Sequence, residues 1–377
     1  MPYTPEQRRA LRKQCDLIVP GFAATSPAEE FRRMADWCQA HAIEHDHYGQ
    51  GPLIAAFEQK IAALLGKPAA TFMPSGIMAQ LAAVRLWTEA AGVDRFGMHP
   101  TSHLVHHEEE AYAALLHCHG VVLGDRLRPM LASDLQAVRQ PLACVIVELP
   151  IREAGGQLPS WDELEALKAA ARQRGVHLHM DGARLWESAA HYRKSYAQIA
   201  EGFDSVYVSV YKGIGALSGA LLAGSDDFIA NARLWRRRMG GTLYHLSPMV
   251  VSATMRLDER IALMPALYER TLDFAAGLSA QGLGAQGPDA RAPLRLNPAV
   301  PHTNMLHLHF DAAADAVLRA RDELAATKRC WLVDGVQPSE VPGWSVSELY
   351  VGDQLLQADN ARVLPLFAQL CEAMRSA

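Results

Sequence analysis

The chain has 377 residues, of which half are hydrophobic and a fifth are charged, and its formal net charge is −5. This composition excludes a mainly disordered chain, because enough apolar surface is present to offset the entropy lost on folding. At about 150 residues per domain the length suggests two domains. The arginine run at 236–238 is too short to indicate nucleic-acid binding.

The six cysteines are scattered without a C-x-x-C pair, and the first residues lack the apolar stretch of a signal peptide. No segment approaches the roughly 18 consecutive apolar residues of a membrane span. We therefore expect a cytoplasmic protein with reduced thiols that binds neither a membrane nor nucleic acid.

The first predicted elements are helical. Residues 1–45 are expected to form an N-terminal arm, and 53–66 place apolar residues on one helical face, with Gly66 as the stop signal. Short apolar runs follow, and most are continuous, as is typical of strands covered on both faces of a sheet. These predicted strands are 70–73, 120–124, 142–149, 176–180, 205–210 and 218–224.

One strand–helix–strand unit is especially clear. Strand 142–149 leads through a Gly-Gly turn to Ser160, which with Glu163 fits the capping-box pattern of a helix start. Helical spacing continues to Gly175, and strand 176–180 begins at once. A unit of this length predicts a parallel, right-handed crossover. The predicted fold class is therefore α/β, with a mostly parallel sheet and helices on both faces.

Residues 281–303 contain three glycines and four prolines and are the best candidate for a link between domains. Beyond it we expect a half-exposed strand at 304–310, a helix at 312–326, strands near 329–333 and 344–351, and a last helix at 356–375. The predicted organisation is an N-terminal arm (1–45), a large domain (46–280) and a small α+β domain (281–377) that includes the arm.

Lys212 is the first chemically notable residue. It follows a β-branched strand and precedes Gly213 and Gly215, which allow a ligand to approach the backbone closely. Ser209, three residues earlier, would place a hydroxyl near the same point. The alternative interpretation is an ordinary surface lysine in a turn.

Asp181, in HMDGARLWE (179–187), ends a predicted buried strand at the sheet edge where open α/β sheets bind ligands. A buried carboxylate is costly unless it is paired. Its partner is either Arg184, in a structural ion pair, or a protonated heterocyclic nitrogen such as that of a pyridine cofactor.

The segment FMPSGIMAQ (72–80) predicts a strand, a turn at Ser75 and Gly76, and a helix that starts near Ile77. A helix N-terminus presents free N–H groups that suit a phosphate. A simple helix cap by the serine is the alternative.

Together these segments resemble the threonine aldolase and β-eliminating lyase family of pyridoxal-phosphate enzymes. The matching segments, in the family's order, are DHYG (46–49), FMPSGIMA (72–79), SHLVHHE (102–108), EAGGQLP (153–159), HMDGARLWESA (179–189), the lysine segment around 210–225, and WRRRMGG (235–241). The resemblance implies the PLP-dependent transferase fold (fold type I) and pyridoxal 5'-phosphate as the cofactor.

The resemblance also implies roles for individual residues. Lys212 would bind the cofactor covalently and carry protons, and Asp181 would pair with the pyridine nitrogen. Arg184 would lie near the phenolic oxygen or the substrate carboxylate, and His103 would stack on the cofactor ring.

On the phosphate side, the resemblance implies that Ser75, Gly76 and Ile77 bind through their backbone N–H groups. The family usually has threonine where this chain has Ile77, so one hydroxyl is missing, and Ser209 is the candidate to replace it.

The departures from the family lie mostly on the substrate side. Ile151 occupies the place of the histidine thought to handle the substrate's hydroxyl proton. The family's N-terminal Ser-Asp-Thr segment is replaced by 16–27, and no arginine occurs at 343–348, where one should bind the substrate carboxylate. We expect the cofactor chemistry to be kept and the substrate to differ from threonine or to be held differently.

His107 is the candidate replacement base, with His47 behind it, and Arg152 is the candidate replacement anchor. The alternative for each is an exposed side chain with no role. The histidine-rich span 99–119 raises a separate zinc-site hypothesis, but it lacks a fixed metal-site spacing, and we expect no metal.

The leading reaction is retro-aldol cleavage of a β-hydroxy-α-amino acid to glycine and an aldehyde. β-Elimination, transamination and a non-catalytic descendant of the family remain as alternatives, because the cofactor residues do not separate them. The resemblance further implies a homodimer or homotetramer with shared active sites, in which Tyr48 and 235–241 reach a neighbouring subunit.

Overall fold

The structure is a computed structural model that describes residues 3–23, 25–285 and 292–375. It divides into two compact units. The large unit comprises 25–151 and 158–263, and the small unit comprises the chain up to 24, 152–157, and the chain from 264 onward. Among the described residues, no helix has both the length and the apolar character that crossing a membrane requires.

In the structure the large unit begins after residue 24 and ends at residue 263. The sequence predicted that the large domain begins after residue 45 and ends at residue 280. Part of the predicted arm belongs to the large unit, because Glu30 of α2 (Pro27–Ala40) forms an ion pair with Arg256 of α12 (Ser247–Ala280). The helix α12 is also continuous over 34 residues, so its first part belongs to the large unit and its last part to the small unit.

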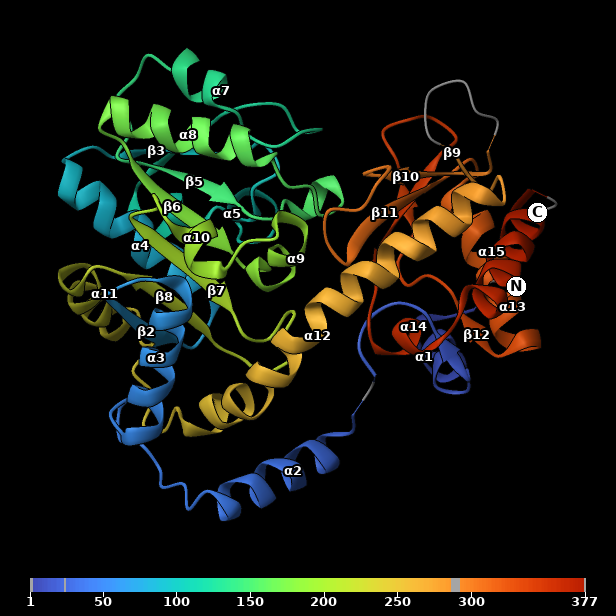
Figure 1. The fold of residues 1–377 in the computed structure, drawn as a ribbon, viewed down its shortest axis with the longest axis horizontal. Helices are drawn as coiled ribbons and strands as arrows, with labels where there is room; N and C mark the ends of the chain where they lie inside the picture. Colours follow the sequence, from blue (N-terminus) through green and yellow to red (C-terminus); the bar gives the residue numbers. More distant parts are fainter. Residues whose placement is uncertain (1–2, 24, 286–291, 376–377) are drawn as a thin grey trace. The chain divides into compact units, whose positions relative to one another are not determined.

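A seven-stranded sheet forms the centre of the large unit, in the order β2-β8-β7-β6-β5-β3-β4. Every strand is parallel to its neighbours except β8, which is antiparallel to both β2 and β7. This confirms the predicted α/β class with a mostly parallel sheet. The strands, which apart from β4 are labelled in Figure 1, are β2 (Ala69–Met73), β3 (Arg95–Met98), β4 (His119–Val122), β5 (Cys144–Glu148), β6 (His177–Gly182), β7 (Ser205–Ser209) and β8 (Ala220–Gly224).

Helices α4 and α11 pack together against β2, β7 and β8, and α3 and α10 form a second pair, of which α3 contacts β2 and β8. The remaining helices of this unit are short, apart from α2 and α8, which have 14 residues each. Besides α2, the helices are α3 (Pro52–Leu65), α4 (Gly76–Ala91), α5 (His103–His106), α6 (Ala111–Leu116), α7 (Ala132–Ala137), α8 (Trp161–Arg174), α9 (Ala189–Tyr192), α10 (Tyr196–Ala200) and α11 (Asp226–Arg238).

The predicted strand–helix–strand unit is confirmed as β5-α8-β6. The Ser160 hydroxyl accepts the backbone N–H of Glu163 at 3.3 Å, and Gly175 ends the helix in the left-handed region at φ 64°. Strands β5 and β6 pair in parallel, with Glu148 directly beside Asp181. The crossover therefore brings two carboxylates together at one edge of the sheet.

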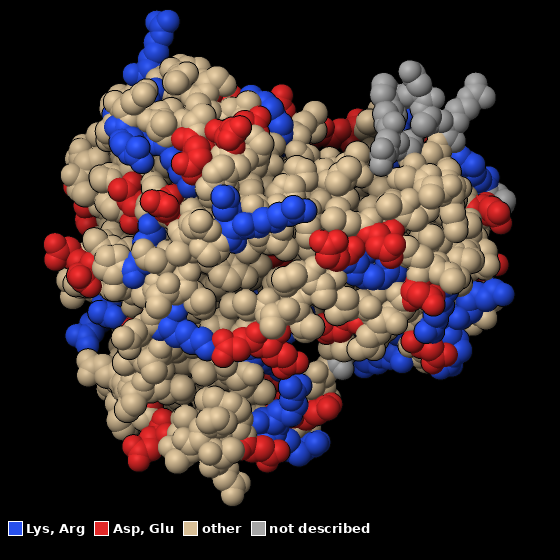
Figure 2. Space-filling model, viewed as in Figure 1, with Lys and Arg blue, Asp and Glu red and all other residues tan. Residues whose placement is uncertain are grey.

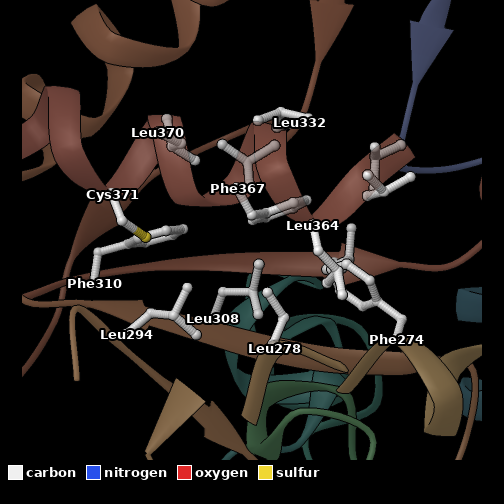
Figure 3. Close-up of a cluster of buried hydrophobic side chains, with 14 of the residues drawn as sticks. Phe274, Leu278, Leu294, Leu308, Phe310, Leu332, Leu364, Phe367, Leu370 and Cys371 are labelled. Atoms are coloured by element: carbon white, nitrogen blue, oxygen red, sulfur yellow. The ribbon is translucent and has the colours of Figure 1, made fainter. Parts of the chain in front are cut away.

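The small unit contains an antiparallel sheet in which β11 pairs with β10 and β14. Leu308 and Phe310 of β11 pack against Phe367 of the last helix and Phe274 of α12 (Figure 3). Exposure alternates along β11, as predicted for a half-exposed strand. The elements are α1 (Pro5–Lys13), β1 (Leu17–Ile18), β9 (Gly284–Ala285), β10 (Leu294–Asn297), β11 (Met305–Phe310), α13 (Ala314–Lys328), β12 (Cys330–Trp331), β13 (Gln337–Pro338), β14 (Ser345–Tyr350), α14 (Asp353–Gln357) and α15 (Asn360–Arg375).

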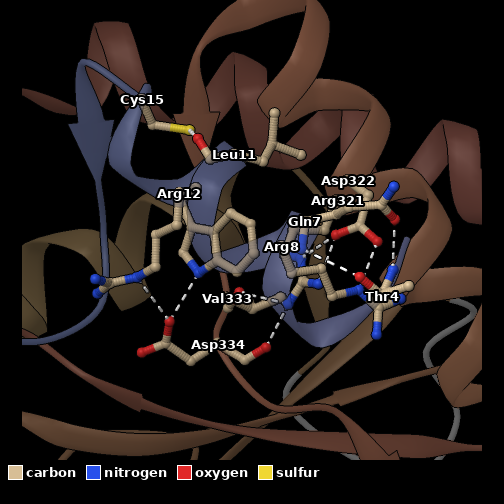
Figure 4. Close-up of polar contacts among 11 residues, drawn as sticks. Thr4, Gln7, Arg8, Leu11, Arg12, Cys15, Arg321, Asp322, Val333 and Asp334 are labelled. Atoms are coloured by element: carbon tan, nitrogen blue, oxygen red, sulfur yellow. Dashed lines mark hydrogen bonds and ion pairs between the residues drawn. The ribbon is translucent and has the colours of Figure 1, made fainter. Parts of the chain in front are cut away.

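Charged residues fix the N-terminal helix α1 within the small unit. Asp322 is 3% exposed and accepts Nε of Arg8 at 2.8 Å and Nη2 of the equally buried Arg321 at 2.5 Å (Figure 4). Elsewhere the charges are dispersed: on the face drawn in Figure 2, basic and acidic side chains intermingle and form no continuous basic stripe.

We expect Asp322→Ala to lower the free energy of unfolding by about 3 kcal/mol, because the buried Arg321 guanidinium would lose its counter-charge. Urea unfolding of the full chain measures this loss. Asp16→Ala is the matched control, since it breaks an ion pair with Arg329 that is exposed on both sides, and it should leave the unfolding curve unchanged. Equal effects of the two substitutions would contradict this interpretation.

Candidate active site

The candidate site lies in the large unit, where the carboxyl ends of β5, β6 and β7 meet. Glu148 is the last residue of β5, Asp181 is the penultimate residue of β6, and Ser209 is the last residue of β7. Lys212 follows three residues later. Because the strands are parallel, their ends meet at the edge where open α/β sheets bind ligands.

Asp181 is 5% exposed, and both of its carboxylate oxygens accept a hydrogen bond. Oδ1 accepts the backbone N–H of Ala183 at 3.0 Å, and Oδ2 accepts Nε2 of Gln80 at 2.5 Å. No ion pair joins Asp181 to Arg184 within the described part of the chain, so the structural alternative considered from the sequence is not formed. Nε of Arg184 is buried without a hydrogen-bond partner among those residues.

Glu148 is nearly as buried as Asp181, and its Oε1 accepts the backbone N–H of His103 at 2.7 Å. Burial and the adjacent Asp181 raise the pKa of Glu148 to about 8, although the nearby Lys212 ammonium opposes this shift. At neutral pH Glu148 is therefore mostly protonated, and the pair carries its negative charge on one side only.

His103 begins α5, and its Nδ1 lies 2.9 Å from Oε1 of the buried Glu108. The ring of His107 is close by, with its centroid 4.9 Å from that of His103. His47 lies in a different ring cluster, 5.5 Å from Tyr244 and 5.4 Å from His245. The structure thus places His103 and His107, the two predicted catalytic histidines, side by side, and it places His47 in a separate cluster.

Helix α4 begins where the phosphate site was predicted. The Ser75 hydroxyl accepts the backbone N–H of Met78 at 3.2 Å and so caps the helix, and the Ile77 side chain is 38% exposed. A Cβ on Gly76 would collide with the Tyr207 hydroxyl and lie 3.1 Å from that of Tyr211. Only glycine fits this position.

Tyr207 and Tyr211 are site residues that the sequence reasoning missed. Their hydroxyls are hydrogen-bonded to each other, and Asp181 contributes to raising the pKa of both, although burial is the largest cause. The signal available in the sequence was SVYVSVYK (205–212), where two tyrosines lie four residues apart and end beside the predicted lysine.

Ser209 is fully buried, and its hydroxyl donates to the backbone carbonyl of Ala183 at 2.7 Å. Its own carbonyl accepts the indole N–H of Trp186 at 2.8 Å. These bonds fix the end of β7 to the turn after β6. The phosphate-binding role predicted for Ser209 therefore receives no support from the geometry.

Lys212 is half-buried, with Nζ 5.8 Å from the Tyr211 ring centroid. A Cβ at Gly213 would lie 2.6 Å from Oε1 of Glu187, and Gly215 has φ 73°, so the turn after the lysine needs glycine at both positions. The sequence predicted that these glycines let a ligand approach the backbone; in the structure the side chain that approaches Gly213 is Glu187, and the ligand contact stays a prediction.

Ile151 and Arg152 are the two substrate-side positions that follow β5 in the chain. Ile151 is 3% exposed, and Arg152, which belongs to the small unit, pairs with Glu153 at 3.0 Å and with Glu348 at 2.7 Å. Its charge is thus balanced within the protein. Of the histidine-rich span, His99 is buried against backbone carbonyls, and the described ranges contain no group of three or more metal-binding side chains. The zinc-site hypothesis gains no support.

We expect the melting temperature of Glu148→Gln, relative to the unsubstituted protein, to rise progressively between about pH 5 and pH 8. In that interval the unfolded chain has released the Glu148 proton, whose ordinary pKa is 4.5, while the folded protein still holds it at a pKa of about 8. Holding the proton therefore costs more stability as the pH rises, and glutamine removes this cost.

Melting curves at several pH values measure the difference. Glu201→Gln, an exposed change on the same unit, is the control and should give a constant offset. A pH-independent offset for Glu148→Gln would contradict the raised pKa.

The residues at this edge fit pyridoxal phosphate. The group needs an acidic partner for its ring nitrogen, an amine for its aldehyde and a donor for its phenolic oxygen. The site contains the buried Asp181, the amine of Lys212 and the unsatisfied Nε of Arg184. The start of α4 offers backbone N–H groups to a phosphate.

Comparison with known proteins agrees with this chemistry. The chain matches the β-eliminating lyase family over residues 24–290. It is 25% identical over 299 residues to low-specificity L-threonine aldolase 1 of Arabidopsis thaliana, covering 76% of this chain and 79% of that protein. It is 26% identical over 272 residues to the low-specificity L-threonine aldolase of Escherichia coli K12, covering 68% and 78%.

Two solved structures are similar over nearly the whole chain. One is a candidate L-allo-threonine aldolase from Listeria monocytogenes, with a TM-score of 0.88 and 33% identity over 97% of this chain and 98% of that one. The other, from Exiguobacterium sp., is a candidate aromatic amino acid β-eliminating lyase/threonine aldolase, with a TM-score of 0.88 and 34% identity over 97% and 99%. Given these matches and the site described above, the chain belongs to the β-eliminating lyase family and is a pyridoxal-phosphate-dependent lyase of fold type I.

Proposed function

We propose that this protein cleaves a β-hydroxy-α-amino acid to glycine and an aldehyde by a retro-aldol reaction. The observation that carries the proposal is that Asp181 and Lys212 lie at the same edge of the sheet, where Lys212 acts on the pKa of Glu148 beside Asp181, in a chain whose relatives over most of its length are named threonine aldolases. The cofactor, when bound, stores the electron pair released as the substrate bond breaks.

Three residues of this chain serve the cofactor in the proposal. Asp181 keeps a proton on the ring nitrogen, and the two N–H donors from Gln80 and Ala183 stabilise its carboxylate. Lys212 binds the aldehyde carbon and moves a proton at its Nζ. Arg184 directs its unsatisfied Nε towards the phenolic oxygen or the substrate carboxylate.

His103 is the base that we propose for the hydroxyl proton. When its Nδ1 donates to Glu108 at 2.9 Å, its Nε2 carries a lone pair and accepts a proton, and the buried carboxylate stabilises the resulting charge. His107, whose ring lies beside that of His103, is the second candidate for this role.

β-Elimination from a β-substituted amino acid is the second candidate reaction. It is favoured by the family match and by Ile151, which offers no proton acceptor where the threonine aldolase pattern has a histidine. Elimination requires a leaving group on the β carbon and no base for a hydroxyl.

We also propose a cytoplasmic homo-oligomer with shared active sites. All six cysteines are free, in keeping with a reducing compartment. Exposed Tyr48 and Tyr244 stack edge to face at 5.2 Å. A cavity of about 520 Å³, lined by Tyr48, Arg236 and Arg237 among others, lies in the same unit. Exposed aromatic groups beside arginines are typical of a surface covered by another subunit.

A panel of substrates tests the reaction. With β-hydroxy amino acids (threonine, allo-threonine and phenylserine) we expect equal amounts of glycine and aldehyde, and with β-substituted alanines neither ammonia nor a keto acid. Lys212→Ala is the control and should lose both turnover and the borohydride-reducible link to the cofactor. Ammonia and keto acid instead of aldehyde would establish β-elimination, and no product from any substrate would establish a non-catalytic protein.

His103→Phe is expected to lower kcat/KM for the retro-aldol reaction by about 100-fold or more, which is the usual contribution of a positioned general base. The absorbance spectrum of the bound cofactor should persist, because phenylalanine still covers a ring face. His107→Phe is the matched variant, and a larger loss from it would transfer the proposed role to His107.

A further inference from the structure

A chain of buried hydrogen bonds ends at the Asp181 carboxylate. Trp87 Nε1 donates to Ser205 Oγ at 2.8 Å, and the same hydroxyl lies 2.8 Å from His179 Nδ1. His179 Nε2 lies 2.6 Å from Gln80 Oε1, and Gln80 Nε2 donates to Asp181 Oδ2 at 2.5 Å. Gln80, His179 and Ser205 are each at most 1% exposed. The four residues Trp87, Ser205, His179 and Gln80 are called the Asp181 relay below.

Strand pairing and helix spacing place these residues together. His179 and Asp181 are two residues apart on β6 and so share one face of the sheet, and Ser205 of β7 pairs directly with His179. Gln80 and Trp87 are seven residues apart on α4, which is two turns, so both point to the same side of the helix.

The carboxylate end of the relay fixes the direction of its hydrogen bonds. An indole N–H can only donate, and an ionised carboxylate can only accept. From the carboxylate end, Gln80 donates its amide N–H to Asp181, so its oxygen faces His179 and His179 carries its proton on Nε2. Ser205 accepts from Trp87 and has its own proton available, so it donates that proton to Nδ1 of His179, which carries none in this tautomer. Burial lowers the pKa of His179 to about 3, in keeping with a neutral ring.

The relay prevents Gln80 from turning its amide group over. A turned amide would bring its oxygen against the Asp181 carboxylate and its NH₂ against the N–H of His179. An acceptor would then face an acceptor at Asp181, and a donor would face a donor at His179. Because the site is fully buried, the hydrogen bonds at both ends of the amide would be lost. His179 therefore acts on Asp181 through Gln80, without touching it.

We propose that the Asp181 relay positions the Asp181 carboxylate and keeps the negative charge of the Glu148–Asp181 pair on Asp181. Asp181 accepts two N–H donors, from Gln80 and Ala183, whereas Glu148 accepts one N–H donor, the backbone of His103, and a smaller contribution from the Ser102 side chain. Donors stabilise the ionised form, and Asp181 has the larger number of N–H donors, so Asp181 holds the charge. Gln80 and His179 are positioning residues, and this inference rests on the role proposed for Asp181.

The first test uses the cofactor-free protein with ¹⁵N-labelled histidine, observed by NMR. His179, assigned by comparison with His179→Asn, should show the neutral Nε2–H tautomer, unchanged between pH 5 and 9. The Nδ1–H tautomer, or titration of His179 within this range, would overturn the proposed direction of the relay.

The second test measures cofactor affinity in Gln80→Met, which keeps the length of the side chain and removes both hydrogen bonds. We expect cofactor affinity to fall about tenfold or more, in line with the loss of a charge-assisted hydrogen bond, and the pH at which bound-cofactor absorbance changes to shift. Ser205→Ala, which is further from Asp181 in the relay, should change the cofactor affinity and the absorbance pH in the same direction as Gln80→Met but by a smaller amount. Thr88→Val, which alters a buried hydroxyl on the same helix outside the relay, is the control and should leave both unchanged.

Unchanged affinity and absorbance in a folded Gln80→Met protein would overturn the positioning role, whereas aldehyde production would be unaffected by that failure. Conversely, if no variant and no parent protein releases aldehyde while the tautomer and affinity effects appear, the proposed reaction fails and the relay stands.

Discussion

A buried negative charge at the end of β6 is the constraint on which the rest of the site depends. Asp181 is 5% exposed, and a buried charge is strongly destabilising unless hydrogen-bond donors and a cationic partner lie close by. The protein supplies the donors through Gln80 and Ala183. Among the residues that the structure describes, no arginine forms an ion pair with Asp181, although Arg184 is three residues away, and this leaves the carboxylate ready for a cation that comes with the cofactor.

The fold creates this situation through ordinary strand pairing. The parallel register of β5 and β6 puts Glu148 beside Asp181, and that of β6 and β7 puts Tyr207 on the other side. Two adjacent carboxylates do not both ionise in a buried site, so one of them must keep its proton. Strand pairing thus brings the two carboxyl groups together, and the side chains packed around them determine which one keeps the proton.

Local patterns in the sequence were sufficient to predict the elements that position these acids. The apolar runs predicted six strands of the large unit's sheet to within two residues, and the capping box at Ser160 fixed the crossover between β5 and β6. Strand β3 was missed, because Arg95–Met98 contains an arginine and a glycine in four residues. Helix α12 was missed as one element, although Ser247 and Pro248 at its start and Gly282 after its end are ordinary helix boundary signals.

Tertiary partners were beyond the reach of such patterns. Gln80 lies 101 residues from Asp181 and 99 from His179, and no spacing rule relates them. Tyr207 was taken only as part of an apolar strand, yet its hydroxyl reaches the start of α4. For Ser209 the position in the sequence suggested a ligand contact, whereas burial against Ala183 uses its proton inside the protein. What a polar side chain donates to is decided by the neighbours that folding brings to it.

The departures from the family pattern lie mostly outside the residues that hold Asp181. The residues that hold Asp181 are buried in one network within the large unit, where a single change leaves several groups unsatisfied. On the substrate side, Arg152 forms its ion pairs with Glu153 and Glu348, outside that network, so its position is bound by fewer constraints. A site built in this way keeps its cofactor chemistry while the groups that recognise the substrate vary, which is the combination found in this chain.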